Sequence, residues 1–210
     1  MTYAFALVDG GAATNIADAG QWVGSLIDGW AVWIADTAGT YDRAALANEL
    51  QYSTTVGNPG GSGPGSLEFT LPVDGIGAGP EGVTNFYYQF PGAGSGATTG
   101  TDWTGATVSA WINTAAISPG TSVSAYLGIG NKTFTLYGSP VALTTGDGGA
   151  SAWQQLTLVV PAAGGDAGAW DPTQVNQIAV YLNPTAYAAP DGGVVGSVTV
   201  YLDDVTVTPH

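Results

Sequence analysis

The sequence predicts an all-β fold, an antiparallel β-sandwich of the jelly-roll kind. Glycine makes up 33 of the 210 residues, threonine and serine are abundant, and glutamate and lysine are scarce. This composition disfavours helices and favours short strands joined by tight turns. Many segments also alternate apolar and polar residues with a period of two, as strands with one buried face require. A chain of this length can bury its own core, so we expect one domain over residues 1–210.

The N-terminal part is patterned less clearly than the rest. Residues 11–28 and the glycine- and proline-rich residues 58–65 predict loops. Residues 41–49 are the only stretch of helical composition. Trp30 shares a face with apolar neighbours and is expected in the core. Apolar runs predict strands over residues 3–8 and 29–35, and residues 50–55 are a further candidate strand.

Alternation is clear in the remainder of the chain. Each strand there has one apolar face, which predicts antiparallel sheets packed face to face. Trp103 and Trp153 lie at strand starts and are expected to fill the core. The alternating segments are 66–71, 85–90, 108–113, 122–127, 133–137, 155–160, 177–183 and 198–207.

The last of these segments changes phase at two adjacent acidic residues. Its apolar residues occupy even positions up to Leu202 and odd positions from Val205 onward. A slip of one residue turns every following side chain to the other face. A β-bulge at Asp203 and Asp204 is the simplest arrangement that keeps both halves on the core.

Two carboxylates in so apolar a strand need compensation, because a partly buried carboxylate is costly unless it is paired or bound to a metal. The chain contains only Arg43 and Lys132 as permanent cations, which disfavours a salt bridge. A hard cation such as Ca²⁺, held by oxygen ligands, is the natural partner of Asp203 and Asp204. The alternative is that both carboxylates face water where the strand frays.

The charge and the residue types exclude several classes of function. A net charge of −14 disfavours nucleic acid and anionic membranes, since both require a basic surface. No apolar run approaches ~18 residues, so no transmembrane helix is expected. The chain has no cysteine and one histidine, which removes Ser-His and Cys-His nucleophiles and zinc. The three glutamates form no local motif, so we do not expect an enzyme.

Several aromatic residues fall on the polar side of their own strands. Rings on an outward face beside amides and hydroxyls suit a neutral sugar, whose C–H face stacks on the ring while the amides bond its hydroxyls. The alternative is that outward tyrosines are common on strands and contact nothing. The candidate ligand-binding residues are Trp111, Tyr126, Tyr181, Tyr87, Gln89, Asn113, Gln177 and Asn183.

Segments of the C-terminal half resemble a known family in order. These are 101–113 (T-D-W-T-G-A-T-V-S-A-W-I-N), 122–137, 153–160 (W-Q-Q-L-T-L-V-V), 177–182 and 200–207 (V-Y-L-D-D-V-T-V). They are similar to the calcium-containing β-sandwich carbohydrate-binding modules attached to bacterial polysaccharide hydrolases, the mannan- and β-glucan-binding groups above all. The resemblance implies a galactose-binding-like sandwich, secreted to the extracellular space as a monomeric module of a larger enzyme. It also implies a structural Ca²⁺ ligated by Asp203 and, near the first strand, by Asp9, with Asp204 as the other candidate.

The leading functional prediction is therefore a non-catalytic module that binds a neutral polysaccharide, β-mannan or β-glucan. A calcium-stabilised structural or adhesive domain of a secreted bacterial surface protein is the alternative, and a polysaccharide hydrolase or lyase is a weaker one. A purely structural sandwich is expected to keep its aromatic residues on core faces, so the position of the rings discriminates between the first two.

Overall fold

The computed structural model describes residues 2–3, 22–27, 30–34, 50–61, 65–74, 84–89, 100–117, 122–130, 135–144, 153–161, 170–185 and 194–210. Within these residues the only helical element is one 3₁₀ turn, η3 (Pro172–Gln174). No helix in this part of the chain is long and apolar enough to cross a membrane. The prediction of an all-β antiparallel sandwich is confirmed, whereas the helix expected over 41–49 lies outside the described residues.

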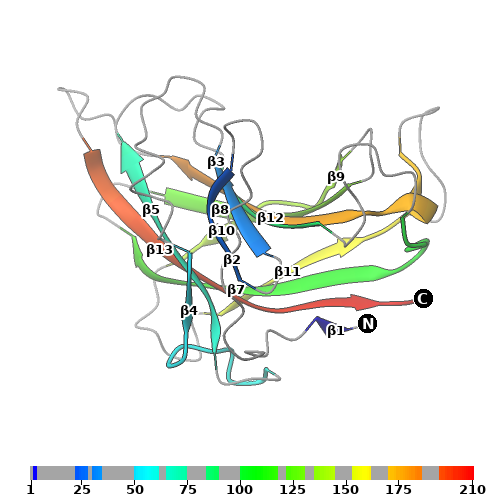
Figure 1. Ribbon diagram of the computed structural model, residues 1–210, viewed down its shortest axis with the longest axis horizontal. Helices are drawn as coiled ribbons and strands as arrows, with labels where there is room; N and C mark the ends of the chain where they lie inside the picture. The colour runs from blue at the N-terminus through cyan, green and yellow to red at the C-terminus, as the bar shows by residue number, and fades with distance from the viewer. Residues whose placement is uncertain are drawn as a thin grey trace.

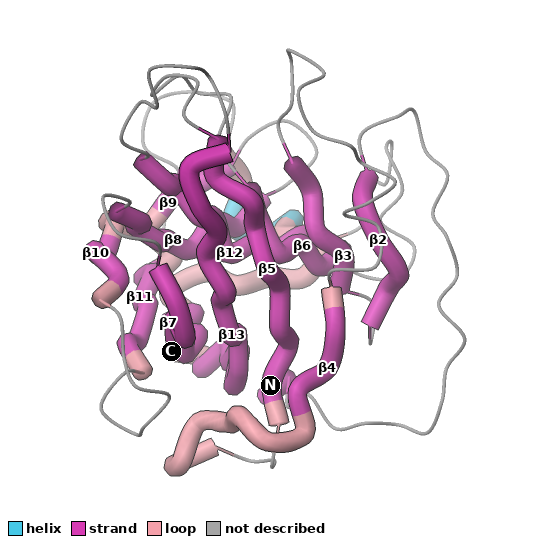
Figure 2. Tube along the Cα trace, turned by 90° about the vertical axis from the view of Figure 1, so that its left-hand side faces the viewer, coloured by secondary structure: helices cyan, strands magenta, loops and turns pink. Residues whose placement is uncertain are grey.

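Two antiparallel sheets form the two layers of the sandwich (Figure 1). The first, called the β13 sheet, has the order β11-β7-β13-β5-β4, with β1 beside β13. Its strand β13 is the longest and lies between β7 and β5, as Figure 2 shows from the side. The strands of the β13 sheet are β1 (Thr2–Tyr3), β4 (Gln51–Ser53), β5 (Ser66–Asp74), β7 (Thr107–Ile117), β11 (Gln154–Val159) and β13 (Val194–Thr208).

The second sheet, called the β12 sheet, has the order β10-β8-β12-β6-β3-β2, with β9 also beside β8. Strand β2 corrects the sequence prediction, which placed a loop over 11–28. Its ladder with β3 shifts register between Val23 and Ile27, so its residues show no constant period of two. The strands of the β12 sheet are β2 (Trp22–Ile27), β3 (Trp30–Ile34), β6 (Thr84–Gln89), β8 (Ser122–Gly130), β9 (Thr135–Tyr137), β10 (Val141–Leu143) and β12 (Gln177–Thr185).

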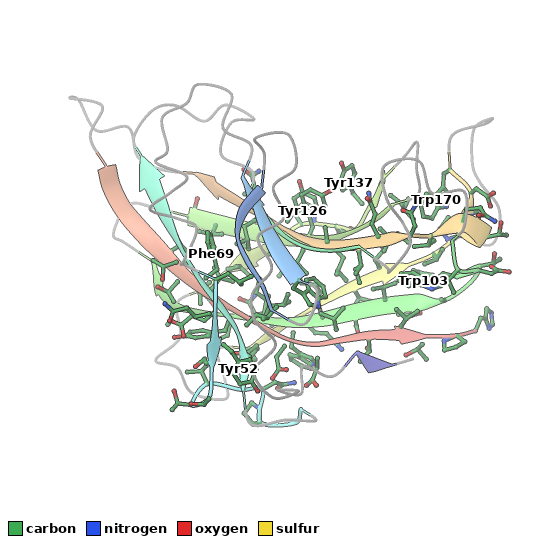
Figure 3. All side chains as sticks on the ribbon, viewed as in Figure 1. Tyr52, Phe69, Trp103, Tyr126, Tyr137 and Trp170 are labelled. Carbon is green, nitrogen blue, oxygen red and sulfur yellow. The ribbon has the colours of Figure 1, made fainter. Side chains whose placement is uncertain are left out.

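The apolar faces of the two sheets meet in one core. Phe69 of the β13 sheet and Leu182 of the β12 sheet are completely buried there. Trp30 and Trp103 belong to this core, as the sequence predicted, and Trp153 is also buried. Figure 3 shows Phe69 and Trp103 between the layers. Burial of such side chains contributes roughly 1.5–3 kcal/mol each and fixes the outward direction of the residues that alternate with them.

The bulge predicted in the last strand is present. The ladder between β13 and β7 shifts register between Asp203 and Thr206, and Asp204 has a φ of 45°. Aspartate tolerates this left-handed conformation better than most residues with a side chain. The shift returns Val205 and Val207 to the core, where both are buried.

Candidate functional site

Three tyrosines gather on the β12 sheet. Tyr126 of β8 and Tyr181 of β12 are direct partners in the ladder, and their rings stack with centroids 5.1 Å apart and planes inclined by 6°. Tyr137, at the end of β9, meets both rings edge to face, 5.7 Å from Tyr126 and 5.2 Å from Tyr181. Such pairs are worth about 0.5–1.5 kcal/mol each beyond area burial, so the rings support one another. We call these three residues the tyrosine cluster.

The tyrosine cluster lies on the outer face of the sheet. Leu127 and Leu182, the neighbours of Tyr126 and Tyr181 in the chain, are buried in the core, whereas both tyrosines are partly exposed. Tyr137 is 54% exposed. Figure 3 shows Tyr126 and Tyr137 on the side of the sheet that faces away from the core. The three rings lie beside one another on an outward face. A purely structural sandwich would not require this arrangement.

The phenol of Tyr126 stays protonated at neutral pH. Burial raises its pKa above the ordinary value, and the neighbouring Tyr137 raises it further. A protonated phenol donates one hydrogen bond and accepts others. The ring of Tyr126 is therefore an uncharged aromatic surface with a polar rim.

The ladder register extends the cluster into rows that cross the sheet. One row runs Tyr126, Tyr181, Asn85, Trp33 and Trp22 from β8 to β2. The next row, called the small-residue row, runs Tyr137, Gly128, Ala179, Tyr87 and Ala31. A third row includes Gly130, Gln177 and Gln89. For the members on β2, β3 and β6 only the backbone is described in these rows, so they are placed by register alone.

Four of the eight predicted ligand-binding residues are brought together with described side chains. They are Tyr126, Tyr181, Gln177 and Asn183, all on β8 and β12. Asn183 is exposed, and Gln177 is half-buried with its amide close over Gly130, where any side chain would overlap it. The side chains of Tyr87 and Gln89 lie outside what the structure describes.

The structure separates Trp111 and Asn113 from this surface. Both are on β7, in the opposite sheet, where Trp111 stands between Gln155 and Asp203 in the ladders. Asn113 is 1% exposed, so its amide cannot reach a ligand from this position. The amide atoms of Asn113 also have no hydrogen-bond partner among the described residues. Alternation gave the correct face of β7, β8 and β12 but carries no information on which sheet a strand joins, so the eight residues do not form one surface.

Tyr137 is the member of the tyrosine cluster that the sequence prediction missed. The alternating segment 133–137 contains it in the same phase as Thr135, which was a usable signal. The strand β9 is only three residues long, too short for periodicity to distinguish Tyr137 from any other outward tyrosine.

The aspartate pair at the bulge binds a turn that lies between β4 and β5 in the sequence. Asp203 is 2% exposed; its Oδ2 accepts a hydrogen bond from the Asn58 backbone N–H at 2.8 Å, and its Oδ1 accepts one from the Asp204 N–H at 2.8 Å. Asp204 Oδ2 accepts from the Asn58 side-chain amide at 3.0 Å. The turn closes with a bond from Gly61 N–H to the Asn58 carbonyl, and a side chain at Gly61 would overlap the Asp204 carboxylate.

The charge on Asp203 is only partly compensated by these bonds. Burial raises the pKa of its carboxyl above the ordinary value, the Asn58 N–H opposes the shift, and the negative Asp204 adds to it. The two carboxylates are oxygen donors of the kind that a hard cation takes, whereas the Asn58 amide turns its nitrogen toward Asp204 and its oxygen toward the Gly60 N–H. The described residues supply no group of three acidic or histidine side chains, and Asp9 lies outside them. Calcium therefore remains a prediction.

No protein-family model and no curated protein matches the sequence. Solved structures of similar shape include carbohydrate-binding modules and an adhesin domain. One is the family 11 carbohydrate-binding module from Clostridium thermocellum in complex with a β-1,3-1,4-mixed-linked tetrasaccharide, at 10% identity and a TM-score of 0.45, covering 90% of this chain and 95% of that one.

Two further structures belong to the same comparison. The family 30 carbohydrate-binding module of a cellulosomal cellulase of Clostridium thermocellum has 15% identity and a TM-score of 0.45, covering 85% of this chain and 91% of that one. The K1 cleaved adhesin domain of Lys-gingipain from Porphyromonas gingivalis has 14% identity and a TM-score of 0.43, covering 88% and 93%. At these values the likeness says nothing about the ligand of this chain, which has to be argued from its own residues.

Proposed function

We propose that this chain is a non-catalytic module that binds a neutral glycan on the outer face of the β12 sheet. The observation that carries the proposal is the tyrosine cluster, three mutually packed rings on an outward face with Gln177 and Asn183 on the same two strands. Aromatic faces stack on pyranose C–H groups, and amides bond sugar hydroxyls. Described residues include neither lysine nor arginine, so nothing in this part of the chain would attract an acidic glycan.

The ligand that we propose is β-mannan or β-glucan, and the setting is an extracellular bacterial enzyme that degrades such a polymer. Burial of one sugar face is worth about 1–2 kcal/mol at roughly 25 cal/mol per Å². Two or three stacked units then supply about 2–6 kcal/mol, whereas a Kd between millimolar and micromolar requires about 4–8 kcal/mol, so hydrogen bonds from the amides have to contribute as well.

Replacing Tyr181 with alanine is expected to weaken glycan binding about tenfold. Loss of one stacked sugar face removes about 1–2 kcal/mol, and 1.4 kcal/mol corresponds to a factor of ten in Kd. Tyr181 contacts both other rings, so its removal also takes one ring contact from each of Tyr126 and Tyr137, which keep their contact with each other. Titration calorimetry with mannan and with mixed-linkage β-glucan measures the loss, and thermal unfolding of the same variant checks the fold.

Trp111→Ala is the matched control, since Trp111 is an aromatic residue on the outer face of the opposite sheet. It is expected to keep full affinity. Loss of affinity with Trp111→Ala and retention with Tyr181→Ala would move the site to the β13 sheet. No binding by the unmodified module would favour the adhesive or structural alternative, and release of reducing sugar in the same samples would favour a hydrolase.

We also propose a structural Ca²⁺ at Asp203 and Asp204, with Asp9 as a further ligand. A cation there would relieve the uncompensated charge of Asp203 and the repulsion between the two carboxylates. Calcium at about a hundred times its Kd is expected to stabilise the fold by about 2.7 kcal/mol, by mass action on the folded state.

The measurement is the melting temperature in chelator and after calcium is added back. Magnesium at the same concentration controls for general screening of the net charge of −14. Asp203→Asn is expected to remove the response to calcium. A melting temperature that exhaustive chelation leaves unchanged would show that hydrogen bonds alone satisfy the aspartate pair.

A further inference from the structure

Two rows of residues border the stacked pair of tyrosines, one on each side along the strands. On one side lies the small-residue row, which contains Gly128 of β8 and Ala179 of β12. On the other side lies a row that runs Ala142, Ser124 and Asn183 from β10 to β12, which we call the amide-hydroxyl row. The structure describes all three side chains of the amide-hydroxyl row.

The two rows differ in exposure. Gly128 is buried and Ala179 is 3% exposed, so a ligand cannot reach the small-residue row on β8 and β12. Ala142 and Asn183 are exposed, and Ser124 between them is half-buried. Among these described residues, the open surface next to the stacked tyrosines therefore lies on the side of the amide-hydroxyl row.

The ring of Tyr137 helps to explain this difference. Tyr137 is the ladder partner of Gly128, yet its ring centroid lies 5.2 Å from that of Tyr181 on β12. The strands β9 and β12 are about 10 Å apart, because β8 lies between them and neighbouring strands are about 4.8 Å apart. The ring of Tyr137 therefore leans inward across the small-residue row and covers that side of the stacked pair.

The amide-hydroxyl row carries two polar groups that are available to a ligand. Ser124 and Asn183 are direct partners in the ladder, which places their Cβ atoms about 4.5–5.5 Å apart. A serine hydroxyl and an asparagine amide each both donate and accept hydrogen bonds. The structure gives neither side chain a hydrogen bond to another described residue. The pair therefore suits neighbouring hydroxyl groups of a sugar unit that contacts the tyrosine cluster.

The amide of Gln177 is placed less well for the same task. Along β12, Gln177 is about 13 Å from Tyr181 at roughly 3.3 Å per residue, and the buried Ala179 lies between them. Asn183 is about 7 Å from Tyr181 by the same measure. Gln177 is half-buried, its amide lies close over Gly130, and it already has an interaction partner within the protein.

We propose that Ser124 and Asn183 supply the hydrogen bonds to the glycan, and that the glycan lies on their side of the tyrosine cluster. This inference rests on the proposed function and deepens it, because it assigns the polar contacts of the same surface and excludes Gln177 from them. The ligand chemistry that fits is a neutral sugar unit with two neighbouring free hydroxyl groups.

The test is titration calorimetry with one β-glucan oligosaccharide and one β-mannan oligosaccharide. Asn183→Ala and Ser124→Ala are each expected to weaken binding of the preferred oligosaccharide about three- to tenfold, as loss of one neutral hydrogen bond requires. Gln177→Ala is the matched control, because it removes an amide from the same face of the same strand. It is expected to keep the affinity of the unmodified module.

The outcomes separate this inference from the proposed function. Full affinity in either Asn183→Ala or Ser124→Ala would overturn the inference while leaving glycan binding intact, and so would a larger loss in Gln177→Ala than in both. Absence of binding by the unmodified module would overturn the proposed function and this inference with it. Asn183 is exposed and Ser124→Ala removes a single oxygen atom, so thermal unfolding of both variants is expected to be nearly unchanged.

Discussion

Replacing Asp203 with alanine is expected to lower the free energy of unfolding by about 3 kcal/mol in the presence of chelator. The carboxylate accepts hydrogen bonds from two backbone N–H groups, those of Asn58 and Asp204. A bond to a charged group is worth about 1.5–3 kcal/mol, and an orphaned buried donor costs a similar amount. Removal of the buried charge offsets part of the loss, which keeps the net effect near the value of one strong bond. Chemical denaturation measures it.

Asp102→Ala is the control for this change. Asp102 is exposed, and its Oδ1 accepts one backbone bond, from Thr104 at 2.9 Å. Its replacement is expected to cost under about 1 kcal/mol, as for other exposed caps of this kind. If Asp203→Ala cost no more than Asp102→Ala, the bonds to the Asn58 turn would contribute nothing net to stability.

Replacing Leu182 with alanine is expected to destabilise the fold by about 3 kcal/mol and to leave glycan affinity unchanged. Leu182 is completely buried in the core, and truncation of such a leucine removes its transfer free energy and leaves a cavity. Tyr181, the preceding residue, points to the opposite side of the same strand. Denaturant titration measures the first effect, and calorimetry with glycan at a temperature where the variant is folded measures the second.

The comparison with Tyr181→Ala makes this prediction sharp. The two neighbouring substitutions are expected to have opposite effects. Leu182→Ala lowers stability and leaves binding unchanged, whereas Tyr181→Ala acts mainly on binding. A folded Leu182→Ala protein with weakened glycan affinity would show that the core and the tyrosine cluster are coupled, so that the cluster depends on exact packing below it.

Local pattern predicted most of the strands, though not β2 or β10, and it predicted the bulge, for a physical reason. Period-two alternation records which side of a strand is buried, and the phase change at Asp203 and Asp204 records where that side must be recovered. Both are properties of a few consecutive residues. The ladder of β13 with β7 confirms the bulge at the predicted place.

Local pattern could not predict which residues lie together on the outer face of the β12 sheet. Trp111 and Tyr126 have the same signature, an outward ring between polar neighbours, yet β7 and β8 join different sheets. Sheet membership depends on pairing between segments far apart in the sequence, which alternation does not encode. For the same reason, the contact between Tyr137 and Tyr181 could not be predicted from local pattern. The two residues become neighbours only when β8 pairs with both β9 and β12.

The position of β13 has a consequence for how the molecule is made. This strand follows every other described strand in the sequence, yet it joins β7 to β5 in the middle of its sheet. During synthesis, the ribosome releases β5 and β7 with open edges that no neighbour can pair until residues 194–208 have emerged. Unpaired edges of this kind invite pairing with other chains. The sheet can therefore close only after β13 has been released. A pause or truncation before β13 would leave an aggregation-prone intermediate with unpaired strand edges, and not a smaller stable module.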